Sequence, residues 1–235
     1  MPESLTSLAR RLSVESLMIH ARSLVRASRI EDAQDSFPLY DVVPFPASGR
    51  ITGYFEKHSA DLHPLGPHEV ISWDTPVLDL PGLLSTRRFY FVNRANRVIG
   101  YVHFSDLNKA PSRAPFYALL EAAETSLSAR ISDRLKEAEI KAVCSPRRFK
   151  GIQARLKKQR RSNIDLGWLG ALSFGEILRL ARRFHTVKLD DEELDLLTNF
   201  RNRIAHTNLR LIDTYSDIRR LSKVGNLLQA ITKSA

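Results

Sequence analysis

A succession of strand, helix, strand and strand is predicted twice in the first 110 residues of this 235-residue sequence, and it constrains the fold more than any other feature. The first copy comprises residues 23–27, 29–37, 41–45 and 50–56, and the second comprises residues 70–72, 75–86, 87–94 and 97–104. β-Branched and aromatic residues are enriched in the last two segments of each copy, which favours strands. Pro76 lies in the first turn of the second helix, where its missing N–H costs nothing. The last strand of each copy leads into a further short segment, residues 59–62 in the first and 105–107 in the second, so the N-terminal half is expected to be a tandem βαββα pair.

Short motifs recur in the two copies. The first copy contains Gly53-Tyr54-Phe55 and Asp61-Leu62, and the second contains Thr75-Pro76-Val77, Gly100-Tyr101-Val102 and Ser105-Asp106-Leu107. This pattern resembles a tandem pair of CBS domains, whose sheets pack together around clefts that hold adenosine-containing ligands. The resemblance implies that Thr75 meets a phosphate and Asp106 meets ribose hydroxyls in one cleft, and that Asp61 serves the other.

Two departures and two alternatives bear on this assignment. His103 stands where the family has Thr or Ser, and the first copy has extra residues before Asp61. Gly100 could serve only for close packing, and Asp106 only as a helix cap. An adenine-nucleotide effector is therefore one expectation for this module, and a purely structural CBS pair is the other.

Helical periodicity dominates after a Pro- and Ser-bearing linker at residues 111–115. Apolar residues at steps of three and four predict a long helix over residues 116–143, and further helical segments follow at 166–184, 190–211 and 212–231. The expected fold class is α+β. Its domains are a CBS-like pair over residues 1–110 and an all-α bundle over residues 116–235.

The predicted helix over residues 190–211 carries the residues with the clearest chemistry. Four acidic residues occupy its first turn, where the helix dipole favours them. Leu194, Leu197, Phe200 and Ile204 form its apolar stripe. Arg201 lies at the edge of that stripe, so its guanidinium must be paired or directed into a cleft. Asn202 and His206 share a polar face.

Arg201, Asn202 and His206 together resemble the Arg-Asn-x-x-x-His signature of HEPN domains, a helical family with many ribonucleases and toxin-like defence proteins. The segment Gly170-Ala171-Leu172-Ser173-Phe174-Gly175 also looks like the middle of Abi-like HEPN proteins from phage defence. The resemblance implies RNA cleavage that requires no metal or other cofactor. The alternative is an Arg–His pair that merely satisfies a helix end.

Each motif residue has an expected role in that chemistry. His206 would transfer protons, Arg201 would stabilise the charged phosphate, and Asn202 would orient His206. Glu121 or Glu124 could support Arg201, as acidic residues of the first helix do in some relatives. On an ideal helix Arg201 and His206 point about 140° apart. A homodimer that joins two such helices is therefore expected to complete the site.

Positive charge is concentrated in the same half of the chain. Residues 114–235 carry 23 Lys and Arg against 14 Asp and Glu, whereas residues 1–113 carry 13 against 12. Within residues 145–162 no acidic residue interrupts the basic ones. The candidate RNA-binding residues there are Arg147, Arg148, Lys150, Lys157, Lys158, Arg160 and Arg161. A solvated helix face or a loop is the alternative. Only Phe149 is available within this run for base stacking.

Other classes of function lack sequence support. A single cysteine, Cys144, excludes an intrachain disulfide and favours a reducing compartment. No run approaches 18 apolar residues, so no membrane span is expected, and cytoplasmic localisation is the default. No zinc-ligand set, phosphate-binding glycine loop or nucleophile elbow is present. His58, His63 and His68 recur in a Pro-rich connection and are expected to be scattered loop residues, without a metal.

The leading expectation is thus a dimeric HEPN-type endoribonuclease regulated by a nucleotide-sensing CBS pair, in phage defence or stress response. The alternative is a non-catalytic RNA-binding or dimerisation module.

Overall fold

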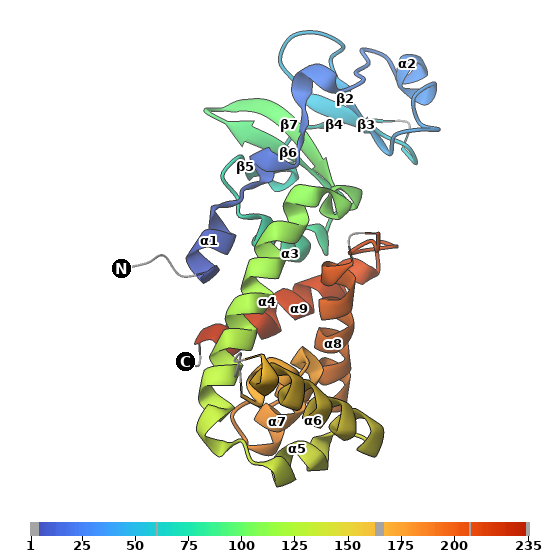
Figure 1. Ribbon diagram of the computed structural model, residues 1–235. Coiled ribbons are helices and arrows are strands. Elements are labelled where there is room, and N and C mark those ends of the chain that lie inside the picture. Colours follow the sequence, from blue (N-terminus) through green and yellow to red (C-terminus); the bar gives the residue numbers. More distant parts are fainter. Residues whose placement is uncertain (1–4, 60, 163–166, 207, 234–235) are drawn as a thin grey trace. The chain divides into compact units, whose positions relative to one another are not determined.

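The computed structural model describes residues 5–59, 61–162, 167–206 and 208–233, which form an α+β fold (Figure 1). The chain divides into two compact units. The sheet unit comprises Arg10–Pro115 and Ile212–Ser222. The helical unit comprises the described residues of Met1–Ala9, Phe116–Leu211 and Lys223–Ala235. One division between the units falls after Pro115, whereas the sequence indicated neither the grouping of residues 5–9 with the helical unit nor that of residues 212–222 with the sheets.

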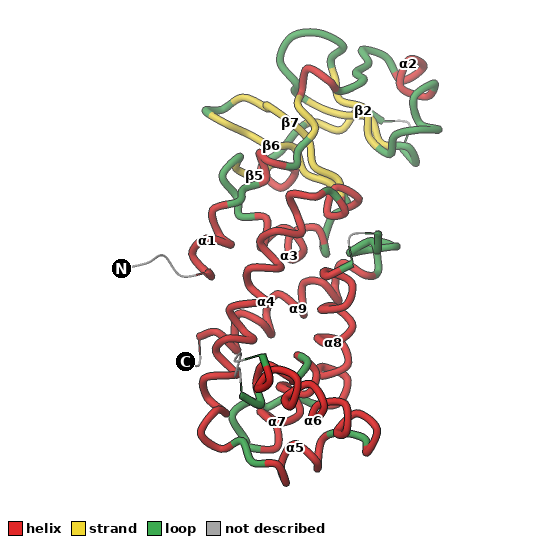
Figure 2. The backbone as a smooth tube through the Cα atoms, in the orientation of Figure 1, coloured by secondary structure: helices red, strands yellow, loops and turns green. Residues whose placement is uncertain are grey.

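All the strands of the described residues belong to the sheet unit (Figure 2). One sheet has the strand order β1-β7-β6-β5 and the other β2-β3-β4. The strands are β1 (Ile19–His20), β2 (Val42–Phe45), β3 (Gly53–Glu56), β4 (Leu62–Pro64), β5 (Val70–Ser72), β6 (Phe89–Arg94) and β7 (Arg97–His103).

The second predicted copy folds as expected. Strand β5 pairs in parallel with β6, and the crossover between them contains the 3-10 helix η4 (Val77–Asp79) and helix α3 (Leu80–Leu84). Strand β6 then pairs antiparallel with β7. The turn between them has positive φ at Ala95 (47°) and Asn96 (60°). Positive φ at both positions matches the right-handed twist of a hairpin.

The first copy matches only in part. Strands β2 and β3 pair antiparallel, and helix α2 (Ile30–Gln34) lies within the predicted helical range. The predicted strand over residues 23–27 is wrong. The 3-10 helix η2 (Ala21–Ser23) begins this region, and Ala27 N–H donates to the carbonyl of Pro44 at 3.0 Å. The edge strands β1 and β4 were not predicted, because two or three residues are too few to display an alternating pattern.

Aromatic side chains join the two sheets into one core. Tyr54 of β3 lies 5.3 Å from Phe89 and 5.7 Å from Phe91 between ring centroids. Phe89 in turn stacks on Tyr101 at 5.7 Å. Val42 and Ile51 are buried in the same cluster. The sheets therefore pack face to face, as alternating inward-facing residues on both would require.

The glycines of the two recurring Gly-Tyr motifs allow close approach of an edge strand. A Cβ at Gly53 would lie 2.6 Å from the carbonyl oxygen of His63, and one at Gly100 would lie 2.9 Å from that of Ile19 and collide with Met18 Sδ. We therefore expect Gly53→Ala and Gly100→Ala each to destabilise the protein, since backbone atoms must move. Urea unfolding measures the effect. Gly151→Ala is the control, because a Cβ there meets nothing within 4 Å.

The helical unit is built from α4 (Ala110–Ile131), α5 (Glu137–Val143), α6 (Pro146–Arg161), α7 (Phe174–Arg183), α8 (Asp191–Ala205) and α9 (Asp217–Lys233), of which α4 and α9 also contribute residues to the sheet unit. The remaining helices are α1 (Leu5–Arg11) and the short 3-10 helices η1 (Val14–Ser16), η3 (Pro67–Glu69), η5 (Phe104–Asn108), η6 (Ser132–Arg134) and η7 (Leu169–Ala171).

Helix α4 overturns two boundary predictions. The expected linker at residues 111–115 is helical, since Pro111 falls in the first turn and costs no hydrogen bond there. The long helix expected to reach residue 143 ends at Ile131. Leu135, which the apolar periodicity included, has extended backbone angles (φ −73°, ψ 109°) after η6. The three- and four-residue spacing of apolar residues continues past Ile131, although the helix itself ends there.

Candidate functional site

Helix α8 presents the Arg-Asn-x-x-x-His motif at its C-terminal end. Its start is fixed by a capping box in which Asp190 Oδ1 accepts from Glu193 N–H at 2.7 Å and Glu193 Oε2 accepts from Asp190 N–H at 3.3 Å. The predicted apolar stripe is buried: Leu194, Leu197, Phe200 and Ile204. Phe200 meets Phe116 of α4, with ring centroids 5.9 Å apart. Packing of this stripe therefore orients the opposite face outward.

The helix ends at Ala205, six residues before its predicted end. His206 takes an extended conformation (φ −104°, ψ 105°) while its N–H still donates to the carbonyl of Asn202 at 3.2 Å. The carbonyl of His206 then accepts from Leu209 N–H at 3.0 Å. Asn208, which has low helix propensity, lies in a turn beyond this point. The ideal-helix angle between Arg201 and His206 therefore does not apply.

Arg201 is exposed, which corrects the expectation of a guanidinium at the edge of the buried stripe. Its charge acts on a polar face of α4. Burial raises the pKa of the half-buried Glu124 and the nearby Glu121 carboxylate raises it further, whereas Arg201 lowers it. The predicted support of Arg201 by Glu124 is thus consistent with their electrostatic proximity.

Tyr117 belongs to the same face and was missed by sequence reasoning. The Glu121 carboxylate, by its charge and by a hydrogen bond, raises the pKa of Tyr117, and Arg201 lowers it. Positions 117, 121 and 124 are spaced by four and three, which places them on one side of a helix. That spacing was visible in the sequence, but its relation to Arg201 required the packing of α4 against α8.

Asn202 and His206 are exposed, like Arg201. The motif residues therefore lie on accessible surface at one end of α8, beside two carboxylates and a phenol. An accessible guanidinium can hold a phosphate, and an accessible imidazole can transfer protons. The charge of Arg201 lowers the pKa of both Tyr117 and Glu124, so the three side chains share one electrostatic environment.

The basic run at residues 145–162 forms helix α6, and one of its predicted RNA-binding residues is structural. Arg148 Nε donates to Glu176 Oε1 at 2.6 Å, and its Nη2 donates to Oε2 at 2.8 Å. Burial raises the pKa of Glu176, but hydrogen bonds from Arg148 and Ser173 outweigh it and lower the pKa to about 2. Arg148 is thus committed to a buried carboxylate.

The other predicted RNA-binding residues of this run are exposed: Arg147, Lys150, Lys157, Lys158, Arg160 and Arg161. Phe149, Ile152 and Leu156 are buried and anchor the helix, so Phe149 offers no ring for base stacking. Burial and the neighbouring Glu176 carboxylate raise the pKa of Cys144 to about 11, so its thiol is protonated at neutral pH.

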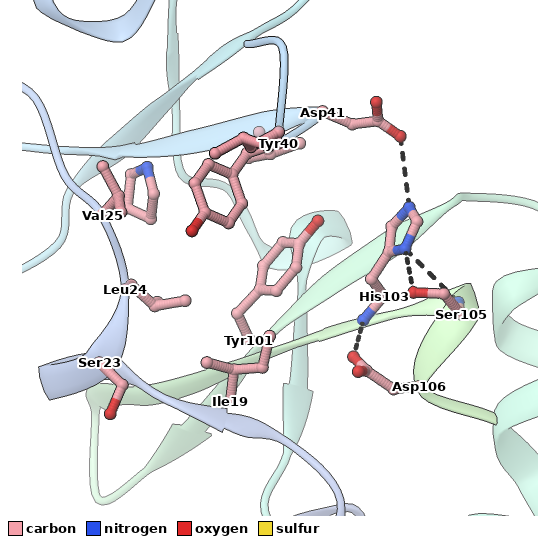
Figure 3. Close-up of a pocket in the computed structure, with 13 residues that line it drawn as sticks. Ile19, Ser23, Leu24, Val25, Tyr40, Asp41, Tyr101, His103, Ser105 and Asp106 are labelled. Atoms are coloured by element: carbon pink, nitrogen blue, oxygen red, sulfur yellow. Dashed lines mark hydrogen bonds and ion pairs between the residues drawn. The ribbon is translucent and has the colours of Figure 1, made fainter. Parts of the chain in front are cut away.

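A cleft of about 390 Å³ opens in the sheet unit (Figure 3). Ser23, Tyr40, Asp41, Tyr101, His103 and Asp106 are among its lining residues. Asp106 is buried, at 5% exposure. Its Oδ2 accepts from His103 N–H at 2.7 Å, and its Oδ1 pairs with Lys109 Nζ at 2.8 Å. Asp106 therefore has the capping role, and a ribose hydroxyl would share oxygens that are already hydrogen-bonded.

His103 faces the cleft with a neutral ring at pH 7. Its Nδ1 lies 2.8 Å from Ser105 Oγ, and its Nε2 lies 3.4 Å from Asp41 Oδ2 (Figure 3). Burial lowers the pKa of His103, and the Asp41 carboxylate opposes this only in part. Burial also raises the pKa of Tyr101, so its hydroxyl remains a possible donor in the same cleft. Tyr40, Asp41 and Tyr101 had not been predicted as site residues.

Neither Thr75, expected in the same cleft as Asp106, nor Asp61, expected in the other cleft, lines the 390 Å³ cleft. The carbonyl of Thr75 accepts from Val14 N–H at 2.8 Å, and Thr75 is not among the residues that line the cleft. Asp61 is exposed, and its backbone N–H donates to Ser59 Oγ at 3.2 Å. The roles assigned to Thr75 and Asp61 therefore stay predictions, because short motifs do not specify which segments meet.

A second, more open cleft of about 720 Å³ lies on the sheet unit. Thr52, Ser72, Trp73, Asn93 and Arg94 are among its lining residues. Asn93 Oδ1 is buried without a hydrogen-bond partner in the part of the chain that the structure describes. No predicted site residue lines this cleft, and a lone polar residue inside a strand gives no sequence signal for one.

The loop histidines do not assemble. His63 stacks on Tyr54 with ring centroids 5.2 Å apart, and within the described ranges no three His, Cys, Asp or Glu side chains gather as a metal site would require. Of the helices in the described residues, none has the length and apolarity to cross a membrane. Comparisons with protein-family models, curated proteins and solved structures give no match to this chain.

Proposed function

We propose that this protein is a metal-independent endoribonuclease of HEPN type, acting as a homodimer in the cytoplasm. The observation that carries the proposal is the accessibility of Arg201, Asn202 and His206 at one end of α8. A pair that merely satisfied a helix end would be expected to be buried, whereas both residues are exposed.

The reaction needs no group that the chain does not supply. The ribose 2′-oxygen bonds to the adjacent phosphorus as its proton passes to a base, and the P–O5′ bond breaks as the leaving oxygen gains a proton. His206 serves in proton transfer, and Arg201 stabilises the charge that develops on the phosphorane. Asn202 positions His206. The products are a 2′,3′-cyclic phosphate and a 5′-hydroxyl.

A homodimer would supply the second proton-transferring group. One imidazole cannot accept and donate a proton at opposite oxygens in the same step, whereas two copies of α8 would provide two. We therefore expect the protein to sediment as a dimer, and we expect the cleavage rate to fall when dilution dissociates the dimer.

Cleavage of RNA in the presence of a chelator tests the proposal. We expect wild type to cut single-stranded RNA in excess EDTA and to leave 5′-hydroxyl ends that a kinase can label directly. Binding without cutting, at all nucleotide concentrations, would instead support the second candidate, a non-catalytic RNA-binding module. The exposed cations of α6 favour that candidate equally.

The sheet unit is proposed to sense an adenine nucleotide as a CBS-like pair. Its parallel β5–β6 crossover and face-to-face sheets support this part of the proposal. The 390 Å³ cleft is within the usual range for small ligands and has the aromatic rings of Tyr40 and Tyr101 for a base. Calorimetric titration with ATP, ADP and AMP tests binding. If none of them produces heat, nucleotide sensing is rejected and the sheet unit has only a structural role.

A hydrogen-bonded link between η5 and the segment that follows His206 supports regulation of cleavage by a nucleotide. Asn108 is the last residue of η5, the 3-10 helix that contains Asp106 and is capped by His103, and it exchanges two hydrogen bonds with the backbone of Ile212, at 2.9 and 3.1 Å. Phe104 and Arg88 hold Tyr215 in the same unit. Ile212 follows His206 by only six residues. A ligand that moves η5 would therefore pull on the segment that follows the motif.

Asn108→Ala is expected to uncouple nucleotide binding from RNA cleavage. Removing the amide breaks both bonds to Ile212 while leaving the cleft side chains in place, so nucleotide affinity should change little. The effect of nucleotide on the cleavage rate should shrink toward none. Cleavage assays with and without nucleotide measure it, with Asn226→Ala as the control at an exposed amide of α9. Full regulation in Asn108→Ala would contradict this route.

A further inference from the structure

The basic helix α6 borders a groove that also contains a tryptophan. The groove has a volume of about 520 Å³ and is lined by Glu137, Gln153, Leu156, Lys157, Arg160, Arg161 and Trp168. The α6 residues among these follow one another at three, four, seven and eight positions from Gln153, so they form a single stripe of the helix. The stripe spans about 12 Å.

The charges around the groove favour an anion. Lys157, Arg160 and Arg161 contribute three positive charges, and Glu137 contributes the one negative charge among the lining residues. Gln153 Nε2 donates to Glu137 Oε1 at 3.0 Å, which holds that carboxylate at the α5 end. Phosphates bound along the stripe would therefore contact Lys157, Arg160 and Arg161, away from the end of the groove where Gln153 meets Glu137.

Trp168 distinguishes this groove from a simple basic surface. Its side chain is half-buried and belongs to the groove lining, although it comes from a different segment from α6. An indole beside two arginines offers a flat face to a nucleobase, and arginine can add stacking of its own. Such a face is of no use to a bare phosphate or to bases already stacked in a duplex.

We propose that the groove between α6 and Trp168 binds single-stranded RNA, with one base stacked on Trp168 and the flanking phosphates on Lys157, Arg160 and Arg161. This inference rests on the proposed function in taking RNA as the partner of the helical unit. It assigns a substrate-holding site separate from the Arg201–His206 chemistry. It also gives the helical unit a preference for unpaired over duplex RNA.

Fluorescence of Trp168 tests the proposal directly. Trp73 is the other tryptophan, so Trp73→Phe leaves Trp168 as the sole indole emitter. His206→Ala is added to prevent cleavage during the titration. We expect single-stranded RNA to quench Trp168, while inorganic polyphosphate binds without comparable quenching and duplex RNA binds more weakly. Equal quenching by polyphosphate would overturn the stacking role.

Substitutions separate stacking from charge. Trp168→Ala should weaken binding of single-stranded RNA by about 5- to 100-fold, whereas Trp168→Phe, which keeps an aromatic face, should lose much less. Arg160→Gln and Arg161→Gln should each reduce the salt dependence of binding by about 0.7 in the log–log slope. Arg219→Gln, at an exposed arginine of α9, is the control. Unchanged affinity in both Trp168 variants would overturn the site.

Failure of this site and failure of the ribonuclease proposal give different results. If wild type cleaves RNA but Trp168→Ala binds it normally, the groove assignment falls and the cleavage assignment stands. If Trp168 is quenched by single-stranded RNA but wild type never cuts it, the groove stands and the catalytic assignment falls.

Discussion

Arg201→Ala and His206→Ala are each expected to slow RNA cleavage by at least about 100-fold. Loss of the guanidinium removes charge stabilisation from the phosphorane, which is typically worth about 100- to 1,000-fold. Loss of the imidazole removes general acid–base catalysis, worth about 100- to 10,000-fold. Single-turnover rates at saturating RNA measure both effects without interference from weaker binding.

Controls make the result specific to the chemistry. Both side chains are exposed, so neither substitution should lower the thermal midpoint of unfolding by more than a degree or two. Arg201→Lys keeps the charge but loses the planar fork, and should retain intermediate activity. Arg219→Ala removes an exposed arginine elsewhere and should cut at the wild-type rate. Undiminished cleavage by either motif variant would remove the catalytic assignment.

Arg148→Ala is expected to lower the free energy of unfolding by about 3–5 kcal/mol. Glu176 is 4% exposed, and its two carboxylate oxygens lose the paired bonds from the guanidinium. Glu176 would keep the hydrogen bonds from Ser173 to Oε2, but losing the guanidinium beside a buried carboxylate is far costlier than losing a surface ion pair. Urea unfolding monitored by circular dichroism measures the change. Arg147→Ala, the exposed neighbour, should stay within about 0.5 kcal/mol of wild type.

The same pair makes stability fall in acid. The pKa of Glu176 is about 2 in the folded protein against an ordinary value of 4.5, so its contribution is complete above pH 4.5 and is lost as the pH falls toward 2. The shift corresponds to about 3 kcal/mol. Glu176→Gln should be less stable at neutral pH and should lack this part of the acid dependence. An identical pH profile in wild type and Glu176→Gln would contradict the assignment.

Local patterns predicted the elements that are regular and long enough to display a period. Strands β6 and β7, their Ala95–Asn96 turn and the buried stripe of α8 all follow from alternation, turn chemistry or helical spacing. Strands β1 and β4 were missed because pairing to a neighbour, and not their own sequence, makes them strands. The end of α8 was misplaced because apolar periodicity does not register the turn at His206.

The site residues also fall into two groups, those that the sequence indicated and those that only the tertiary structure revealed. The sequence singled out Arg201, Asn202 and His206 through their resemblance to a family signature, and it singled out the basic run of α6 through the clustering of Lys and Arg. Only the tertiary structure assigned Arg148 to Glu176, placed Tyr117 and Glu124 in the field of Arg201 and brought Trp168 to α6. The spacing of residues within one helix can be read locally. Each of the contacts just named joins two segments that come together only because their buried faces pack.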